Sequence, residues 1–131
     1  MPKIAIIEDD ESISQMYCFK FETEGYEVRA ADNGQRGLDL IKNMRPDIVL
    51  LDIMMPMMSG DEMLEKMRAT PWGKDVKVML LTNMGEQEMP PRFKELGVIG
   101  IIVKADTTPS QVVEIVKEKL AKPHIDKTPL L

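Results

Sequence analysis

The chain has 131 residues, of which 44% are hydrophobic and 30% charged, and its formal net charge at pH 7 is −5. This size fits one globular domain with its own core, and the acidic balance argues against binding to DNA or to an anionic membrane. A single cysteine and a single histidine argue against a disulfide framework, a cysteine-based zinc site and a Ser-His-Asp hydrolase. The chain has no signal peptide and no apolar run of the roughly 20 residues that span a bilayer, so we expect a cytoplasmic protein.

The first predicted element is a strand, Lys3–Ile7, because its run of apolar residues is typical of a strand buried on both faces. A helix follows, since apolar side chains recur on one helical face and Ser12–Gln15 has capping-box spacing. The strand Tyr26–Ala31 alternates apolar and charged residues, which predicts an edge strand with one face in water. The apolar stripe of the first helix consists of Ile13, Met16, Tyr17 and Phe21.

The middle of the chain repeats this order. A second helix is predicted to follow the capping spacing Asp32–Gln35, and the strand Ile48–Leu51 is again continuously apolar. A third helix is predicted to follow the capping spacing Ser59–Glu62. Six of the 12 methionines lie within Met54–Met67, and we expect them mainly to fill the core. The apolar stripes of the two helices are Gly37, Leu38, Ile41 and Met44, and Gly60, Met63, Leu64 and Met67.

The last part contains the strand Val78–Leu81, a short helix at about Pro91–Leu96 and the strand Ile99–Val103. The helix is short because two consecutive prolines interrupt any helix that begins earlier. A final helix follows the capping box Thr108–Gln111, and its apolar stripe is Val112, Val113, Val116 and Leu120. Residues 122–131 show no periodicity and are predicted to be a frayed tail, which leaves residues 1–121 as the domain.

Five strands alternating with five helices predict an α/β fold with a mainly parallel sheet. Ligands of such sheets bind beyond the carboxyl ends of the strands, so residues that follow the strands are the candidates for function. Carboxylates that gather there must take up protons or hold a cation, and oxygen ligands without nearby His or Cys suit Mg²⁺. The polar residues at these ends are Glu8, Asp9 and Asp10, then Asp52, then Thr82 and Asn83, and finally Lys104.

Each of these residues also has a simpler explanation. An acidic residue before a helix stabilises the helix N-terminus, and an aspartate after a strand often forms a turn. Thr82 alone is more typical of packing, and Lys104 alone of a solvated strand end. Their joint placement at one edge favours a functional site, in which Asp52 is a candidate nucleophile because a carboxylate can form an aspartyl phosphate.

In order and spacing these residues resemble the receiver domain of two-component response regulators. The resemblance covers about residues 3–121 and implies a flavodoxin-like α/β fold, with a five-stranded parallel sheet in the order 2-1-3-4-5 flanked by five helices. The motifs that carry it are Ile-Ile-Glu-Asp-Asp at 6–10, Pro-Asp-Ile-Val-Leu-Leu-Asp-Ile-Met-Met-Pro at 46–56, Met-Ser-Gly at 58–60, Leu-Leu-Thr at 80–82 and Val-Lys at 103–104.

The resemblance implies a role for each site residue. Asp52 would accept the phosphoryl group, Thr82 would move to hydrogen-bond it, and Lys104 would pair with it. The metal ligands for Mg²⁺ would be Glu8, Asp9, Asp52 and the backbone carbonyl of Met54, and Asp10 would only add flanking charge. No other cofactor is implied.

A receiver takes its phosphoryl group from a histidine kinase or a histidine phosphotransfer protein and later hydrolyses it. It is a phosphoacceptor with self-phosphorylation and self-dephosphorylation activity rather than an enzyme, and it signals through the face made by the fourth helix, fifth strand and fifth helix. Its target would be a downstream protein or an effector domain outside this chain. We expect no direct binding of nucleic acid or membrane by this segment, and the resemblance leaves room for a phosphorylation-dependent homodimer.

Three residues depart from the family pattern. Ala105 follows Lys104, where the family usually has a proline that often forms a cis peptide. A cis peptide before alanine would cost about 3 kcal/mol, so we expect a trans peptide or a rearranged loop. Ile101 stands where the family usually has Tyr or Phe, and Asn83 where it often has Ala. These departures put the usual relay from the phosphoryl group to the output face in doubt.

Two other functions stay open at this point. A pseudo-receiver would be an interaction module that is never phosphorylated; the intact acidic, threonine and lysine positions argue against it, whereas Ile101 and Ala105 keep it in play. A phosphohydrolase of the haloacid-dehalogenase type would need a second aspartate where this chain has Met54. Nucleotide binding ranks lower, because no glycine-rich loop follows any strand.

Overall fold

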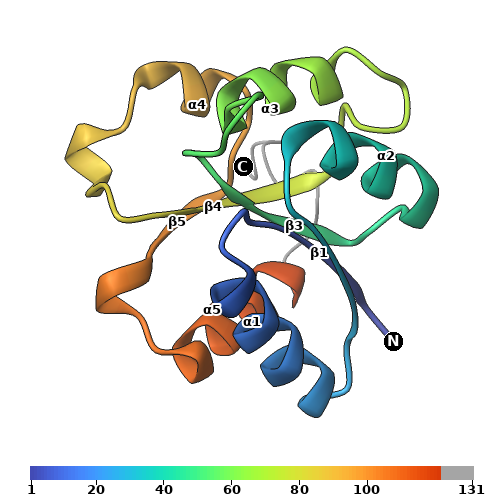
Figure 1. Ribbon diagram of the computed structural model, residues 1–131, viewed down its shortest axis with the longest axis vertical. Coiled ribbons are helices and arrows are strands. Elements are labelled where there is room, and N and C mark those ends of the chain that lie inside the picture. Colours follow the sequence, from blue (N-terminus) through green and yellow to red (C-terminus); the bar gives the residue numbers. More distant parts are fainter. Residues whose placement is uncertain (122–131) are drawn as a thin grey trace, which may run out of the picture.

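Five strands form one parallel sheet in the order β2-β1-β3-β4-β5, which confirms the predicted topology (Figure 1). The structure is a computed structural model that describes residues 1–121. Because neighbouring strands all run parallel, their carboxyl ends lie at the same edge of the sheet. The strands are β1 (Lys3–Ile7), β2 (Glu27–Ala31), β3 (Ile48–Asp52), β4 (Lys77–Thr82) and β5 (Gly100–Val103).

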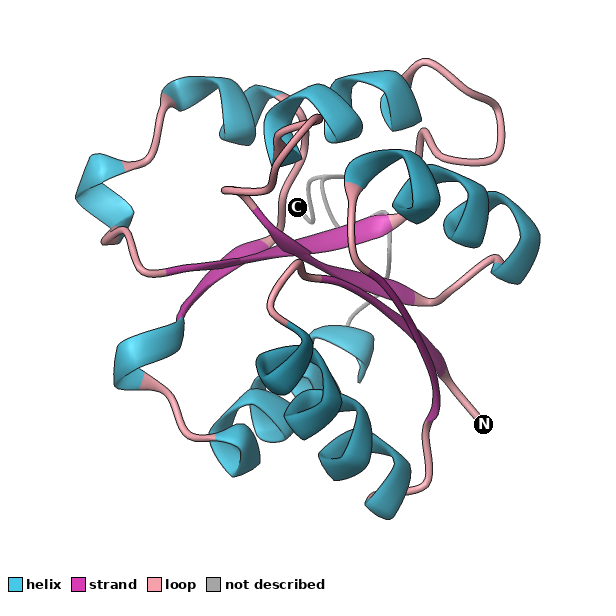
Figure 2. Ribbon diagram, viewed as in Figure 1, coloured by secondary structure: helices cyan, strands magenta, loops and turns pink. Residues whose placement is uncertain are grey.

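Helices cover both faces of the sheet, with α1 and α5 on one side and α2, α3 and α4 on the other (Figures 1 and 2). The helices are α1 (Glu11–Thr23), α2 (Gly34–Met44), α3 (Gly60–Arg68), α4 (Pro91–Glu95) and α5 (Pro109–Ala121), and two short 3-10 helices are η1 (Glu86–Glu88) and η2 (Lys104–Asp106). The described part of the chain contains no helix of the length and apolarity needed to traverse a bilayer.

β1, β3 and β4 are buried on both faces, as predicted, whereas β5 forms the other edge of the sheet and only its Ile102 is fully buried, so its predicted burial is only partly confirmed. Along β1, Ile4 and Ile6 pack with α1 and α5, whereas Ala5 and Ile7 pack with α2 and α3. β3 is buried at every position: Val49 and Leu51 pack in one core layer and Ile48 and Leu50 in the other, while its last residue, Asp52, is a buried polar residue outside both layers. β2 forms one edge of the sheet and is nowhere fully buried, which confirms the predicted edge strand.

Two predicted helix starts are wrong by one or two residues. Asp10, and not Ser12, caps α1, since its Oδ1 accepts a hydrogen bond from the Ile13 amide at 3.0 Å. Asn33 caps α2 in the same way through the Arg36 amide. Asp10 lies two residues before the predicted cap of α1, and Asn33 lies one residue after the predicted cap of α2, Asp32. In each place the helix begins after the residue whose side-chain oxygen reaches an exposed amide of the first turn. The predicted capping box Thr108–Gln111 is confirmed by both of its hydrogen bonds.

The prediction that the methionines fill the core is only partly confirmed. Met55, Met63 and Met67 are buried, but Met54 and Met57 are 72% and 86% exposed. The loop between β3 and α3 turns outward at Met57, whose φ of 70° places it in the left-handed region. The amide of Met58 donates to the Pro56 carbonyl at 2.7 Å across this residue, which closes a three-residue turn.

The remaining predictions concern the last part of the chain. The fourth helix is short and follows the irregular segment that contains η1, as expected. No peptide in the described residues is cis, so the peptide before Ala105 is trans. The expected tail, residues 122–131, lies outside the described residues.

At the amino-terminal edge of the sheet, Arg68 connects three segments. Its guanidinium donates hydrogen bonds to the carbonyls of Leu96, Gly73 and Val76, at 2.8, 3.0 and 2.7 Å. These carbonyls precede β5 and β4, so one side chain at the end of α3 fastens the entries to two strands.

Candidate functional site

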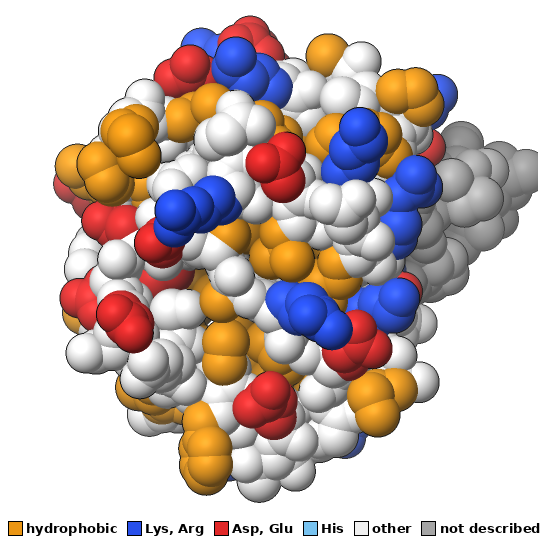
Figure 3. Space-filling view, turned by 45° about the vertical axis from the view of Figure 1, so that its right-hand side comes forward, with side chains coloured by type: hydrophobic (Ala, Val, Ile, Leu, Met, Phe, Trp, Pro, Cys, Tyr) orange, Lys and Arg blue, Asp and Glu red, His pale blue; other side chains and the backbone are white. Residues whose placement is uncertain are grey.

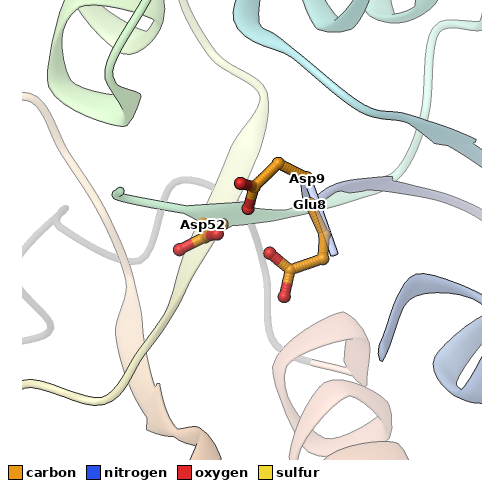
Figure 4. Close-up of side chains that lie close together, drawn as sticks. All are labelled: Glu8, Asp9 and Asp52. Carbon is orange, nitrogen blue, oxygen red and sulfur yellow. The ribbon is translucent and has the colours of Figure 1, made fainter. Parts of the chain in front are cut away.

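Three carboxylates meet at the carboxyl edge of the sheet. Glu8 and Asp9 follow β1, and Asp52 is the last residue of β3 rather than the first residue beyond it. One oxygen from each lies within 4.8 Å of the others. Figure 4 shows the Asp9 side chain directed toward Asp52, with Glu8 beside them. The structure thus brings Glu8 and Asp9 next to Asp52, which lies 43 positions after Asp9 in the chain, as the parallel topology predicts.

Lys104 joins this cluster from the far side of the sheet. It is the first residue after β5, yet its Nζ lies 2.6 Å from Glu8 Oε1 and 3.6 Å from Asp52 Oδ2. Its side chain is only 14% exposed. The predicted gathering of Glu8, Asp52 and Lys104 at one edge is therefore found in the structure.

Burial differs among the three acids. Glu8 is 1% exposed and Asp52 is 4% exposed, whereas Asp9 lies at the surface. Within the described residues, Glu8 Oε2 is a buried oxygen with no hydrogen-bond partner. Leaving such an acceptor unsatisfied is costly, and more so when the group is charged. This oxygen and the two neighbouring carboxylates present hard oxygen donors of the kind that Mg²⁺ prefers, and the residues therefore fit such a cation.

The electrostatics of the site follow from this crowding. Burial raises the pKa of Asp52 to about 6, and the neighbouring Glu8 carboxylate contributes in the same direction. Partial burial and the Asp52 carboxylate also raise the pKa of Asp9. Burial lowers the pKa of Lys104, but its hydrogen bond to Glu8 and the negative charge of Asp52 outweigh burial and raise that pKa overall. Lys104 therefore keeps its positive charge at neutral pH.

The two other candidates, Thr82 and the backbone of Met54, lie at the same edge of the sheet. Thr82 is the last residue of β4 and 3% exposed, and its Oγ1 accepts a hydrogen bond from the Met84 amide at 3.0 Å. The backbone amide of Met54 donates to Asp52 Oδ1 at 3.2 Å. This contact uses the N–H of Met54, so its carbonyl as a metal ligand stays a prediction, as does the role of Thr82.

Sequence reasoning missed the structural role of Gly60 in this site. A Cβ atom on Gly60 would lie 2.7 Å from the Asp52 carbonyl oxygen and 2.8 Å from Ile53 Cα. The first turn of α3 thus packs directly against the backbone that presents the Asp52 side chain. In the sequence, Gly60 is one position of a helical stripe and of the motif Met-Ser-Gly, and neither pattern indicates such a close approach.

Asn83 lies at this edge of the sheet, as predicted, but the contact that its side chain makes was not predicted. Its side-chain oxygen accepts a hydrogen bond from the backbone amide of Ala105 at 3.2 Å. The two residues lie in different loops, and no local pattern in the sequence indicates that they meet.

Comparisons with known proteins all point to response regulators. The profile of a family described as "Response regulator receiver domain" matches residues 4–117. The chain is 33% identical over 130 residues to the phosphate regulon transcriptional regulatory protein PhoB of Rhizobium meliloti, which covers 98% of this chain and 57% of PhoB. It is 37% identical over 97 residues to sporulation initiation phosphotransferase F of Bacillus subtilis, which covers 74% of this chain and 77% of that protein. This chain therefore spans little more than half the length of PhoB.

Solved structures agree with these sequence relatives. The chemotaxis protein CheY4 of Vibrio cholerae superimposes with a TM-score of 0.84 at 28% identity, over 90% of this chain and 98% of CheY4. A CheY-like receiver domain protein from Methanospirillum hungatei gives a TM-score of 0.82 at 32% identity, over 92% of this chain and 94% of that protein.

Proposed function

The chain belongs to the family of response regulator receiver domains, and we propose that it is a phosphorylation-dependent switch with Asp52 as its phosphoacceptor. One observation carries the proposal: the buried Asp52 carboxylate shares its site with two further carboxylates and with the Lys104 ammonium. Positive charge beside a reactive carboxylate, together with ligands for a divalent cation, suits the transfer of an anionic phosphoryl group.

The reacting group in this proposal is the Asp52 carboxylate. One of its oxygens forms a bond to phosphorus, while the bond between phosphorus and the imidazole nitrogen of a partner's phosphohistidine breaks. The imidazole keeps the electron pair of that bond and takes up a proton from solvent. Because the pKa of Asp52 is about 6, its carboxyl group is ionised in most molecules at pH 7 and is then able to attack phosphorus. The chain modifies itself, so it is a phosphoacceptor rather than an enzyme with a separate substrate.

Lys104 and Thr82 would stabilise the transferred group. The Lys104 ammonium, 3.6 Å from Asp52 Oδ2, is placed to pair with a phosphoryl oxygen as negative charge arrives. The Thr82 hydroxyl can donate its proton to another phosphoryl oxygen while its own oxygen continues to accept from the Met84 amide.

Glu8, Asp9 and Asp52, with the backbone carbonyl of Met54, would hold Mg²⁺. When bound, this ion offsets the negative charge of the phosphoryl oxygens and of the carboxylates. The unpartnered oxygen of buried Glu8 supports this assignment, because a cation beside it removes the cost of burying that oxygen without a partner. Asp9, at the surface, can exchange water for the ion without any rearrangement of the core.

The output would start at Thr82. A phosphoryl group adds up to about two negative charges and new acceptor oxygens beside Thr82 and Lys104. The loop after Thr82 leads to α4, and Lys104 follows β5, so both groups connect to the face formed by α4, β5 and α5. Ile101 on β5 is not aromatic, so a relay in this chain would depend on the loop rather than on the turning of an aromatic ring.

Partners follow from this role. The donor would be a histidine kinase or a histidine phosphotransfer protein, and the exposed apolar side chains of Met16 and Phe19 on α1 offer it a contact surface. The target would be a downstream protein or an effector domain, as PhoB is described as a transcriptional regulator and extends well beyond the length of this chain. The formal net charge of −5 supports the proposal that this segment does not itself bind nucleic acid, and the face in Figure 3 carries charged side chains of both signs. A phosphorylation-dependent homodimer would use the α4, β5 and α5 face.

Other functions have less support. A haloacid-dehalogenase-type phosphohydrolase needs an acid–base group two residues after the nucleophile, and Met54 offers an exposed thioether that cannot titrate. A pseudo-receiver would not need the buried, unpartnered oxygen of Glu8 or the ammonium that faces Asp52.

The test is incubation with acetyl phosphate and Mg²⁺, followed by intact mass measurement of the natural chain and of Asp52→Asn. We expect one added phosphoryl group that is absent from the variant and absent in the presence of EDTA. An adduct on Asp52→Asn would assign the reaction to another residue. No adduct on the natural chain, together with no binding of Mg²⁺ or beryllofluoride, would favour the pseudo-receiver.

A further inference from the structure

One side chain reconnects β4 and β5 beyond the end of their pairing. Thr82 and Val103 are the last paired residues, so Asn83 and Lys104 are the first residues past the ladder. Here the Oδ1 atom of Asn83 accepts a hydrogen bond from the Ala105 amide at 3.2 Å. The bond runs from the loop after β4 to η2, the turn that begins with Lys104.

The position of η2 determines where the Lys104 ammonium lies. Within the turn, the Thr107 hydroxyl donates to the Val103 carbonyl at 2.9 Å, which fixes its shape. That bond does not fix the turn relative to β4. The contact between Asn83 and Ala105 supplies such a connection, one residue after the lysine that meets Glu8 and Asp52.

On the other side of this contact, Asn83 is directly bonded to Thr82. The Thr82 oxygen accepts from the Met84 amide, so residues 82–84 form one small hydrogen-bonded turn with Asn83 at its centre. If the Thr82 hydroxyl keeps its bond to the Met84 amide as it moves toward Asp52, the loop moves with it, and so do Asn83 and, through its side chain, the Ala105 amide.

We propose that Asn83 is a positioning residue that couples the loop of Thr82 to the turn of Lys104, so that hydroxyl and ammonium reach a phosphoryl group on Asp52 together. This inference rests on the proposed function. Asn83 does not touch the reacting atoms. Its effect depends on the backbone N–H of Ala105, which donates to Asn83 and which a proline at position 105 would lack.

The experiment compares Asn83→Ala with Asn43→Ala in the full chain. Asn43 is a matched control, because its side chain also bonds to one backbone group, the Asp39 carbonyl, but on α2. Three quantities are measured: amide hydrogen exchange at Ala105, acylation of the Lys104 amine by acetic anhydride relative to the other lysines, and the rate of Asp52 phosphorylation by acetyl phosphate with Mg²⁺.

For Asn83→Ala we expect faster exchange at Ala105, roughly three- to tenfold faster acylation of Lys104 and a phosphorylation rate lower by a similar factor, the size that loss of one neutral hydrogen bond can produce. Asn43→Ala should match the natural chain in all three. A second pair of variants changes the residue that donates the hydrogen bond. Ala105→Pro removes the backbone N–H and should slow phosphorylation, whereas Ala105→Gly keeps the N–H and should leave the phosphorylation rate unchanged.

Each outcome decides the inference. Unchanged Ala105 exchange and Lys104 acylation in Asn83→Ala would overturn it, whatever the phosphorylation rate does. Faster exchange and acylation with an unchanged phosphorylation rate would make Asn83 merely structural and would also overturn it. If the natural chain takes no phosphoryl group, the proposed function fails, and Lys104 acylation still shows whether Asn83 holds that lysine in place.

Discussion

The Nζ atom of Lys104 lies 2.6 Å from Oε1 of Glu8, a residue 96 positions earlier in the chain. Both side chains are largely withdrawn from water, and the second oxygen of Glu8 has no partner among the described residues. Lys104 is therefore the main compensation for a buried negative charge in the metal-free protein.

Replacing Lys104 by Met should destabilise the metal-free protein, because it leaves the Glu8 charge buried without its partner. Breaking a buried ion pair from one side costs roughly 3–5 kcal/mol, and we expect the lower part of that range since the site opens to solvent at Asp9. Urea unfolding in EDTA measures the change. The matched control is Lys20→Met, which removes an exposed pair with Glu24 on α1 and should change stability by less than about 1 kcal/mol. Equal effects of the two substitutions would contradict the assignment.

The raised pKa of Asp52 predicts a specific pH dependence. Without metal, its pKa is about 6 in the folded protein and close to 3.8 when unfolded, so between these values the folded state binds more protons. Stability from this group is therefore highest below about pH 4, falls as pH rises and is lost above about pH 6.

Asp52→Asn removes this dependence. In EDTA the variant should be more stable than the natural chain at pH 7, by on the order of 2 kcal/mol, and the difference should shrink as pH falls toward 4. Asp39→Asn, at an exposed position on α2, is the control and should show no such trend. Denaturant unfolding at several pH values measures both variants, and a difference that grows on acidification would refute the assignment.

Gly60→Ala should disturb the site through the backbone. The new Cβ would meet the Asp52 carbonyl at 2.7 Å and Ile53 Cα at 2.8 Å, and neither backbone group can move without shifting Asp52, the proposed phosphoacceptor. Overpacking of this kind costs typically about 1–3 kcal/mol. We expect that loss in urea unfolding, together with slower phosphorylation by acetyl phosphate. Gly85→Ala is the control, because its Cβ would meet only the end of the Glu88 side chain at 3.5 Å.

Met57→Gly should stabilise the protein. Met57 has a φ of 70°, in a region that glycine adopts freely and other residues adopt at a cost of roughly 1–2 kcal/mol. Because its side chain is 86% exposed, little packing is lost. The net gain in urea unfolding should be about 1 kcal/mol. Met54→Gly, also exposed and without a positive φ, should show no gain; a gain in both variants would point to the loss of a surface thioether rather than to relieved strain.

The elements that were predictable are those whose signal is local. β3 and β4 are nearly continuous apolar runs because both of their faces are covered, and a parallel sheet then places Asp52 and Thr82 at one edge. The main candidate site followed from that topology and from the resemblance of the motifs. The features that could not be predicted depend on distances in the folded chain. Whether Asp10 or Ser12 caps α1 depends on which side-chain oxygen reaches an amide of the first turn. The close approach of Gly60 to Asp52 exists only once α3 is packed.

The contact between Asn83 and Ala105 illustrates the same limit. Each residue read alone is only a departure from the family pattern, and the bond between their loops becomes visible when β4 and β5 are side by side. Likewise, the outward turn at Met57 could not be predicted from a segment rich in methionines, because Met55 is buried whereas Met54 and Met57 are exposed although all three are the same residue type.

The hydrogen bonds of Arg68 restrain the amino-terminal ends of β4 and β5. The Arg68 guanidinium donates to three carbonyls and so fixes the segments that precede β4 and β5, at the end of the sheet opposite the carboxylate cluster. We therefore expect a displacement that begins at the proposed phosphoacceptor, Asp52, to be taken up by the loops after β4 and β5. An engineered reporter of phosphorylation should respond best when it is placed in those loops rather than before the two strands.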